Sequence, residues 1–307
     1  MRIIIAGGSG MIGRALSKSL VNDGNDVIIL SRRPGNLSNL PNVVKEVKWD
    51  GILDTGWEKE IERSDVVINL AGENISGGGL FPQRWTKERK ERLLQSRVNS
   101  GNILSKAIEI ADSRPEIFVQ ASGIGYYGTD RRYEFAEESP PGNDFLANLS
   151  IQWEASSKNV EKCDVRRVVI RSGVVLDAHG GALRPLIFPY KLFIGGPVGD
   201  GNQVLSWIHI DDEVNAIRFI ISNHDASGVF NLTSPNPITN NEFGKTISKV
   251  LKKPHYLPIP AFLMRLALGE VADLVVEGQT VLPKKLLDLG YKFKFPTLDV
   301  ALKDICN

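Results

Sequence analysis

A glycine-rich turn between a strand and a helix constrains the fold of this 307-residue chain more than any other stretch. Residues 3–5 are consecutive isoleucines, a β-branched run typical of a strand buried on both faces of a parallel sheet. Gly7 ends the run, and apolar residues recur at helical spacing between residues 11 and 20, so a helix begins directly after the glycines. This order points free backbone N–H groups and the positive end of a helix dipole at a pyrophosphate. The pattern therefore predicts a dinucleotide site formed by Gly7, Gly10, Met11, Ile12 and Gly13.

The end of the next strand selects the nicotinamide cofactor. Residues 26–31 form the expected second strand, and sites selective for NAD place an Asp or Glu at its end to bind the ribose hydroxyls. This chain has Ser31, Arg32 and Arg33 there, a hydroxyl and two guanidinium groups that can bind a 2′-phosphate through charge-assisted hydrogen bonds. The alternative is a solvated basic loop. We expect NADP(H) as the cofactor.

Strands and helices alternate up to about residue 178, which is typical of an α/β protein with a Rossmann-type, doubly wound parallel sheet. Further strands are expected at residues 43–49, 65–70, 116–121 and 165–171, and helices at 86–111 and 144–163. Leu70, Ala71 and Gly72 follow the fourth strand, where bulky side chains would collide with a bound dinucleotide. Arg97 lies midway along the first of these helices, and it either reaches back to a phosphate or the nicotinamide ribose, or faces solvent.

The alternation then becomes irregular, which predicts a smaller, partly interleaved C-terminal substrate lobe. Glycine and proline are frequent in residues 179–204, as in a substrate-facing excursion. After a strand at 207–210 we expect Asp211 to cap the next helix, Thr239 to begin another with a capping box, and a last helix to end at Gly290. Residues 1–178 and 205–235 are expected to form the dinucleotide-binding domain, and residues 179–204 and 236–307 the substrate lobe.

Composition narrows the class of partner. The formal net charge of +1 gives no reason to expect nucleic acid or an anionic membrane, and a small-molecule substrate remains. Cys163 and Cys306 are too few for a disulfide framework, and four scattered histidines predict no metal site. No apolar run reaches the ~18 residues of a membrane span, and the first strand begins at residue 2. We expect a cytoplasmic monomer or homodimer, with an organelle-directed precursor trimmed to this chain as the alternative.

Several motifs together resemble a known family. Residues 7–13, 69–72, 122–128 and 206–211 resemble the extended short-chain dehydrogenases/reductases, in the nucleotide-sugar epimerase branch. Residues 70–75, Arg84-Trp85, Trp153-Glu154 and the tail motifs between residues 269 and 291 are similar to the atypical subgroup called "epimerase family protein". That subgroup carries a C-terminal domain of unknown function, matched here by about residues 258–303. The resemblance covers essentially the whole chain, and it implies a Rossmann-type domain that holds NADP(H) and a C-terminal lobe that closes over a cleft. Some bacterial and plastid members carry a cell-division label.

The family's usual acid–base pair is missing. Short-chain reductases normally move a proton with a Tyr-x-x-x-Lys pair, and none of the six tyrosines here has a lysine four residues later. Ser122 lies at or next to the hydroxyl position of the family, and Tyr126 and Tyr127 can each offer a phenol as general acid. Each tyrosine can instead pack as an aromatic ring with its hydroxyl bonded to backbone.

Other polar residues are weaker catalytic candidates. Glu73 and Glu154 are expected near the pocket, either as acid–base groups or in salt bridges, and for Glu154 we expect the structural role. His209 at a strand end is expected to be a packing or hydrogen-bonding residue and not a catalyst.

Two functions stay open. The first is an NADP(H)-dependent oxidoreductase or epimerase that acts on an unidentified small polar substrate, nucleotide sugars being one class. The second is an NADP(H)-binding redox sensor or regulatory protein without turnover, with a link to cell division. The missing Tyr-Lys pair favours the sensor, whereas the long closing tail and the glycine-rich cleft loops favour the enzyme. We expect the enzyme.

Overall fold

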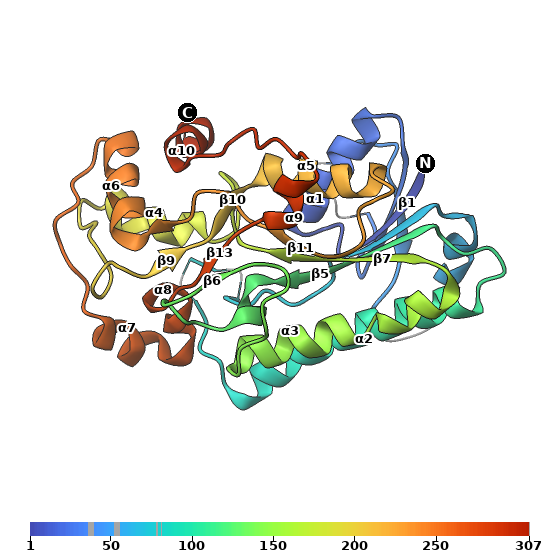
Figure 1. Cartoon of the computed structure of the whole chain (residues 1–307), viewed down its shortest axis with the longest axis horizontal. Helices are drawn as coiled ribbons and strands as arrows, with labels where there is room; N and C mark the ends of the chain where they lie inside the picture. The colour runs from blue at the N-terminus through green and yellow to red at the C-terminus, as the bar shows by residue number, and fades with distance from the viewer. Residues whose placement is uncertain (36–39, 52–55, 78, 81, 307) are drawn as a thin grey trace.

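A seven-stranded parallel sheet forms the centre of the molecule (Figure 1). The computed structural model describes residues 1–35, 40–51, 56–77, 79–80 and 82–306. The strand order is β11-β7-β5-β4-β1-β2-β3, and every neighbouring pair is parallel. The strands are β1 (Arg2–Ala6), β2 (Asp26–Ser31), β3 (Lys45–Lys48), β4 (Val66–Asn69), β5 (Ile117–Gly123), β7 (Arg166–Ser172) and β11 (Gly228–Leu232).

Helices cover both faces of this sheet. α1 (Met11–Asn22) and α5 (Ile210–Ser222) pack together on one face, and α2 (Lys87–Ile110) and α3 (Phe145–Ala155) lie on the other (Figure 1). Burial on both faces explains the continuous isoleucine run, because Ile3 and Ile5 enter one apolar cluster and Ile4 enters another. The predicted doubly wound α/β fold is confirmed.

The winding of the chain reverses between β1 and β4. These strands are neighbours in the sheet, although β2 and β3 separate them in sequence and extend the sheet on the far side of β1. At such a reversal the loops that leave the carboxyl ends of the two strands diverge and open a crevice, the usual ligand position in open α/β sheets. Here these loops begin at Gly7 and Leu70.

The remaining elements lie beside the sheet and include three small strand pairs. β10 (Trp207–His209) pairs with β8 (Val174–Leu176), β12 (Ile238–Thr239) with β9 (Val204–Leu205), and β13 (Thr280–Val281) with β6 (Glu134–Phe135). The other helices are α4 (Leu183–Lys191), α6 (Asn240–Leu251), α7 (Ala261–Leu268), α8 (Asp273–Val276), α9 (Lys284–Asp288) and α10 (Leu298–Cys306). Short 3-10 helices are η1 (Trp57–Arg63), η2 (Ile124–Tyr127), η3 (Lys158–Cys163) and η4 (Gly269–Ala272).

The expected helix at 144–163 is two helices instead of one. α3 ends at Ala155, and η3 begins at Lys158. Arg167 explains the break, because its guanidinium donates to the backbone carbonyl of Glu154 and, at 3.0 Å, to the hydroxyl of Ser157. That carbonyl would otherwise accept the next hydrogen bond of a continuing helix.

Two expectations about the second half are wrong, and one helix was not predicted. The helix that ends before Gly290 is not the last, because α10 follows it, and α4 lies within residues 179–204, where no helix was predicted. The cap of α5 is His209, whose Nδ1 accepts the backbone N–H of Asp211 at 3.1 Å, whereas Asp211 was the expected cap. The capping box at Thr239 is confirmed. Among the described residues, no helix is both long and apolar enough to cross a bilayer.

Candidate functional site

At the crevice, the glycine turn after β1 lies in close contact with the backbone of the loop after β4. Gly7 has a φ of +79°, and a Cβ built on it would lie 2.7 Å from the carbonyl carbon of Leu70. A Cβ on Gly13 would lie 2.6 Å from the carbonyl oxygen of Gly7, so only glycine lets the first turn of α1 pack on the loop. The predicted residues of the two loops are therefore brought together.

The amino end of α1 is open to an anion. Gly10 is the N-cap residue, with no side chain to cap the helix, and no acidic residue lies in the first turn. A Cβ on Gly10 would meet only the carbonyl oxygen of Gly7 within 4 Å, at 3.3 Å. Met11 and Ile12 turn their side chains toward the apolar core, and Gly181 lies against the sulfur of Met11. The first backbone N–H groups of the helix are thus left for a ligand.

Ser31 ends β2, next to this turn, and Arg32 and Arg33 follow it. The hydroxyl of Ser31 is buried and accepts the backbone N–H of Arg33 at 3.2 Å, so its own proton is free to be donated. Both arginine side chains are exposed, and neither forms an ion pair with a described residue. Two unpaired guanidinium groups beside a hydroxyl match the donors that a phosphate dianion needs.

Arg97 is buried beneath the loop that follows β4, so the solvent-facing alternative is wrong. Its side chain is 5% exposed, and a Cβ on Gly72 would lie 3.1 Å from its guanidinium carbon. The guanidinium lies 4.8 Å from the ring of Trp153, Nη1 donates to the carbonyl of Leu93 at 2.9 Å, and Nε is buried without a partner among the described residues. Burial lowers the pKa of Arg97 to about 10. Buried cations and buried hydrogen-bond donors are normally paired, so we expect an anion or a hydrogen-bond acceptor to bind near Arg97 at the crevice.

Ser122 belongs to a buried ion-pair network on the other side of the crevice. Its hydroxyl donates to Oε1 of Glu154 at 2.7 Å, and Glu154 binds Arg171 through both oxygens, at 2.8 and 2.9 Å. Arg171 lies near the end of β7, which pairs with β5 so that Ser122 and Arg171 are register partners. Glu154 therefore has the structural role expected for it.

The two tyrosines have different environments. The hydroxyl of Tyr127 donates to Asn231 at 2.7 Å and accepts from Arg171 at 2.9 Å, and burial raises its pKa to about 12. Tyr126 is half-buried, its ring centroid lies 3.3 Å from the guanidinium carbon of Arg171, and its hydroxyl has no hydrogen-bond partner among the described residues. Tyr126 thus keeps a free phenol, whereas the phenol of Tyr127 is fully engaged.

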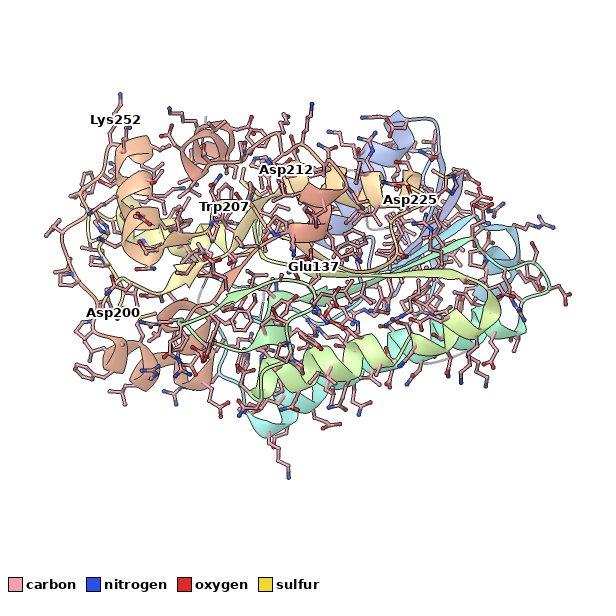
Figure 2. All side chains as sticks on the ribbon, viewed as in Figure 1. Glu137, Asp200, Trp207, Asp212, Asp225 and Lys252 are labelled. Atoms are coloured by element: carbon pink, nitrogen blue, oxygen red, sulfur yellow. The ribbon has the colours of Figure 1, made fainter. Side chains whose placement is uncertain are left out.

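Sequence reasoning missed two buried carboxyl groups near the carboxyl end of β7 and the tail. Glu137 accepts the backbone N–H groups of Asn231 and Lys285, at 3.1 and 3.2 Å. Glu213 accepts the hydroxyl of Ser172 at 2.5 Å, and complete burial raises its pKa to about 8. Glu137 lies within the body of the molecule, as does Asp212 beside Glu213 (Figure 2). No signal in the sequence marked either group, because Glu137 stands beside Glu138 and Glu213 directly follows Asp211 and Asp212.

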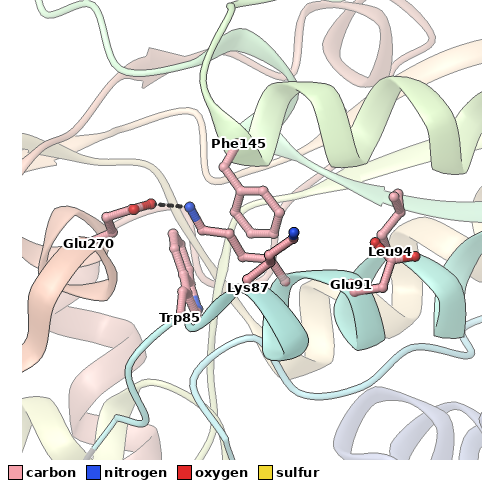
Figure 3. Close-up of a pocket in the computed structure, with 7 residues that line it drawn as sticks. Trp85, Lys87, Glu91, Leu94, Phe145 and Glu270 are labelled. Atoms are coloured by element: carbon pink, nitrogen blue, oxygen red, sulfur yellow. Dashed lines mark hydrogen bonds and ion pairs between the residues drawn. The ribbon is translucent and has the colours of Figure 1, made fainter.

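A pocket of about 420 Å³ lies between α2, α3 and η4. Figure 3 shows the rings of Trp85 and Phe145 and the carboxylate of Glu270 around it. Lys90 forms an ion pair with Glu270 and so links α2 to the tail. None of its lining residues belongs to the predicted cofactor or catalytic sets. In the part of the chain that the structure describes, no group of three or more His, Cys, Asp or Glu residues can hold a metal ion.

Comparison with known proteins identifies the family. A model of the NAD dependent epimerase/dehydratase family matches residues 3–148, and a domain of unknown function, DUF1731, matches residues 259–305. The chain is 38% identical to epimerase family protein YfhF of Bacillus subtilis, covering 99% of this chain and 98% of the relative. It is 37% identical to epimerase family protein SDR39U1 of Mus musculus, covering 99% of each.

The three-dimensional comparison agrees with the sequence comparison. The crystal structure of human epimerase family protein SDR39U1 (isoform2) with NADPH superimposes with a TM-score of 0.87, at 34% identity and 99% coverage of both chains. The family resemblance inferred from the sequence motifs is therefore confirmed. Since both family models and the full length of its relatives match, the chain belongs to the NAD dependent epimerase/dehydratase family, among the epimerase family proteins that end in a DUF1731 domain.

Proposed function

We propose that the protein is an NADP(H)-dependent oxidoreductase or epimerase-like enzyme that acts on a small polar substrate. The observation that carries the proposal is that Arg32 and Arg33, which form no ion pair with a described residue, lie beside a crevice whose backbone accepts only glycine at Gly7 and Gly13. The NADPH in the structure of the human relative supports the same cofactor.

The residues at the crevice fit this cofactor. The first N–H groups of α1, beyond Gly10, would bind the pyrophosphate, and Ser31, Arg32 and Arg33 would bind the 2′-phosphate. The backbone of Leu70, Ala71 and Gly72 forms the opposite wall. Arg97, whose buried Nε has no partner among the described residues, would bind a phosphate or the nicotinamide ribose from below that wall.

Bound NADPH would supply a hydride, and the chain would need a group that moves a proton. We assign this role to Tyr126, because its phenol is unpaired while its ring stacks on the guanidinium of Arg171. Ser122 keeps Glu154 and Arg171 in place, since its proton is donated to Glu154, and it can accept a hydrogen bond from a substrate. Of the three predicted catalytic residues, Tyr126 is thus the proposed proton donor. Ser122 and Tyr127 are proposed as positioning residues. The substrate would lie between this crevice and a lobe of residues 179–204 and 236–307.

The second candidate is a non-catalytic NADP(H)-binding redox sensor or regulatory protein, with cell division as one setting. The specific support for this candidate is that the Tyr127 hydroxyl already donates one hydrogen bond and accepts another within the protein. The enzyme remains the first candidate because the hydroxyl of Tyr126, whose ring lies on Arg171, has no hydrogen-bond partner among the described residues.

A binding titration tests the cofactor. Arg32→Ala should weaken NADPH about 10- to 100-fold, since a hydrogen bond to a charged group contributes about 1.5–3 kcal/mol, and should leave NADH unchanged. Arg63→Ala, which removes another exposed arginine at the end of η1, is the matched control. Equal effects on NADPH and NADH would exclude the 2′-phosphate assignment.

A turnover measurement tests the chemistry. With a panel of carbonyl substrates, the protein should oxidise NADPH, and Tyr126→Phe should slow the reaction by about 10²–10⁴-fold without weakening NADPH binding. Tyr127→Phe should lower the melting temperature, because Asn231 and Arg171 each lose a partner. Intact NADPH binding with no turnover across the panel would favour the sensor.

A further inference from the structure

An exposed apolar tip projects at the end of the molecule that carries α6 and α7. The tip consists of Leu192, Phe193, Ile194, Tyr256 and Leu257, whose exposed fractions lie between 44% and 64%. Two segments distant in sequence form it, because the backbone N–H groups of Tyr256 and Leu257 donate to the carbonyl of Gly195 at 2.9 and 3.2 Å. Its apolar side chains therefore share one surface.

The backbone that presents the tip is held in an unfavourable conformation. Phe193 has a φ of +63° and Lys252 a φ of +54°, and the described residues contain one other non-glycine residue with positive φ, Asp164. The left-handed region is unusual for an aromatic residue and persists where surrounding contacts enforce it. Gly196 shows such a contact, since a Cβ there would lie 1.9 Å from the carbonyl oxygen of Leu257. The fold thus keeps Phe193 on the outside.

A rim of lysines surrounds the apolar tip. Lys191, Lys249 and Lys252 are exposed, and the ammonium of Lys253 lies 3.7 Å above the ring of Phe193. Figure 2 shows Lys252 extending away from the body. Residues 190–199 and 243–264 contain no Asp or Glu, so the whole-chain charge of +1 conceals a local basic excess.

Nearby acidic residues cancel this excess only in part, because Asp299 interacts with Lys249 of the rim as well as with Lys303. Asp200 is paired with Arg131 at 2.9 Å, and Asp299 is paired with Lys303 at 2.7 Å. The apolar surface also continues beyond the tip. α7 has no buried side chain, and its Phe262 is 67% exposed (Figure 1 shows α7 at the same end as α6).

We propose that this end of the protein docks on an anionic lipid bilayer, with the apolar tip in the headgroup region and the lysine rim on lipid phosphates. Aromatic and aliphatic side chains beside lysines match the chemistry of a membrane interface. Lysine is depleted in protein–protein interfaces, and a second copy paired face to face would bring two lysine rims together. We expected no membrane partner because the net charge of the whole chain is +1. A net charge does not show that the lysines gather at one end of the surface.

Vesicle flotation of the full chain tests the proposal. The protein should float with phosphatidylcholine vesicles that contain phosphatidylglycerol and not with phosphatidylcholine alone. Raising the salt from about 0.1 M to about 1 M, which shortens the Debye length from ~10 Å to ~3 Å, should release it. Lys252→Glu should weaken binding at least about fivefold. Phe193→Asn, which suits positive φ, should weaken it about tenfold.

Matched variants and oligomer size complete the test. Ile110→Asn and Lys162→Glu change an exposed apolar residue and an exposed lysine elsewhere, and both should bind vesicles like the unchanged protein. Absence of binding to anionic vesicles, or equal binding by all four variants, would overturn the proposal. A dimer in light scattering that Phe193→Asn dissociates would assign the surface to a second copy, and would overturn it as well.

Discussion

Replacement of Glu154 by leucine should destabilise the protein strongly. Glu154 is the carboxylate that neutralises Arg171, whose side chain is 4% exposed, through two hydrogen bonds of 2.8 and 2.9 Å. Without it, Arg171 keeps only the hydroxyl of Tyr127 and the carbonyl of Glu137 as acceptors, and Ser122 loses its acceptor. Leaving a buried charge unpaired costs about 3–5 kcal/mol. At roughly 2–3 °C per kcal/mol for a long chain, the melting temperature should fall by about 6–15 °C.

The double variant Glu154→Leu/Arg171→Met separates charge burial from loss of packing. Replacing a buried ion pair by apolar residues of similar volume is often nearly neutral, so the double variant should recover most of the loss. Both are measured by thermal and urea unfolding, and Lys45→Ala, which breaks the half-exposed pair with Glu60, is the control with a small expected effect. A loss below about 1 kcal/mol for Glu154→Leu, or a double variant less stable than either single variant, would refute the reasoning.

Two further predictions concern the cofactor turn and pH. Gly10→Val should abolish the stabilisation of the protein by NADPH in a melting assay while leaving the apo protein folded, because a Cβ on Gly10 would contact only the carbonyl oxygen of Gly7, at 3.3 Å. Gly13→Ala should lower apo stability itself by about 1–3 kcal/mol, because its Cβ would lie 2.6 Å from the same oxygen. The reverse order of these effects would contradict the geometry. The contribution of Glu213 to the free energy of unfolding should fall as pH rises from about 4.5 to about 8, because Glu213 binds its proton in the folded state in this range and releases it in the unfolded state. Glu213→Gln should remove this contribution from the urea-unfolding profile.

The turn and the sheet were predictable because their signals are local. The isoleucine run, the glycine spacing and the apolar periodicity lie within residues 3–20, and each depends on contacts that every strand–turn–helix unit of this type makes. The second strand, residues 26–31, was predicted with the bounds of β2 for the same reason. Local signals therefore gave the fold and the position of the crevice.

The errors arose where tertiary contacts override local patterns. α4 contains Pro189 near its carboxyl end, and a proline-rich, glycine-rich segment reads as irregular. α3 stops because Arg167, from β7, bonds to its backbone carbonyl, and nothing near Ala155 in sequence announces that contact. α10 did have a signal, since Leu298, Ala301 and Leu302 recur at helical spacing and are buried.

The catalytic side of the site was less predictable than the cofactor side. Tyr126 and Tyr127 are adjacent in sequence, and only the partners Arg171 and Asn231, far along the chain, distinguish them. A sequence pattern carries no information on which of two neighbouring phenols is engaged. Arginine at the end of the apolar strand β7 was the one hint that a buried partner existed.

The pairing of β13 with β6, which lies far earlier in the chain, has a consequence for folding during synthesis on the ribosome. The backbone of β13 is held by the hydroxyl groups of Ser206 and Thr233, at 2.9 and 3.0 Å, and the next residue, Leu282, is held by the amide of Asn231, which also binds Tyr127. Asn231 therefore acquires its full set of partners only after the chain has been synthesised as far as Leu282. A nascent chain that already contains the whole glycine turn still lacks the partners of Asn231 beside Tyr127, so competence for chemistry should appear only once β13 has paired.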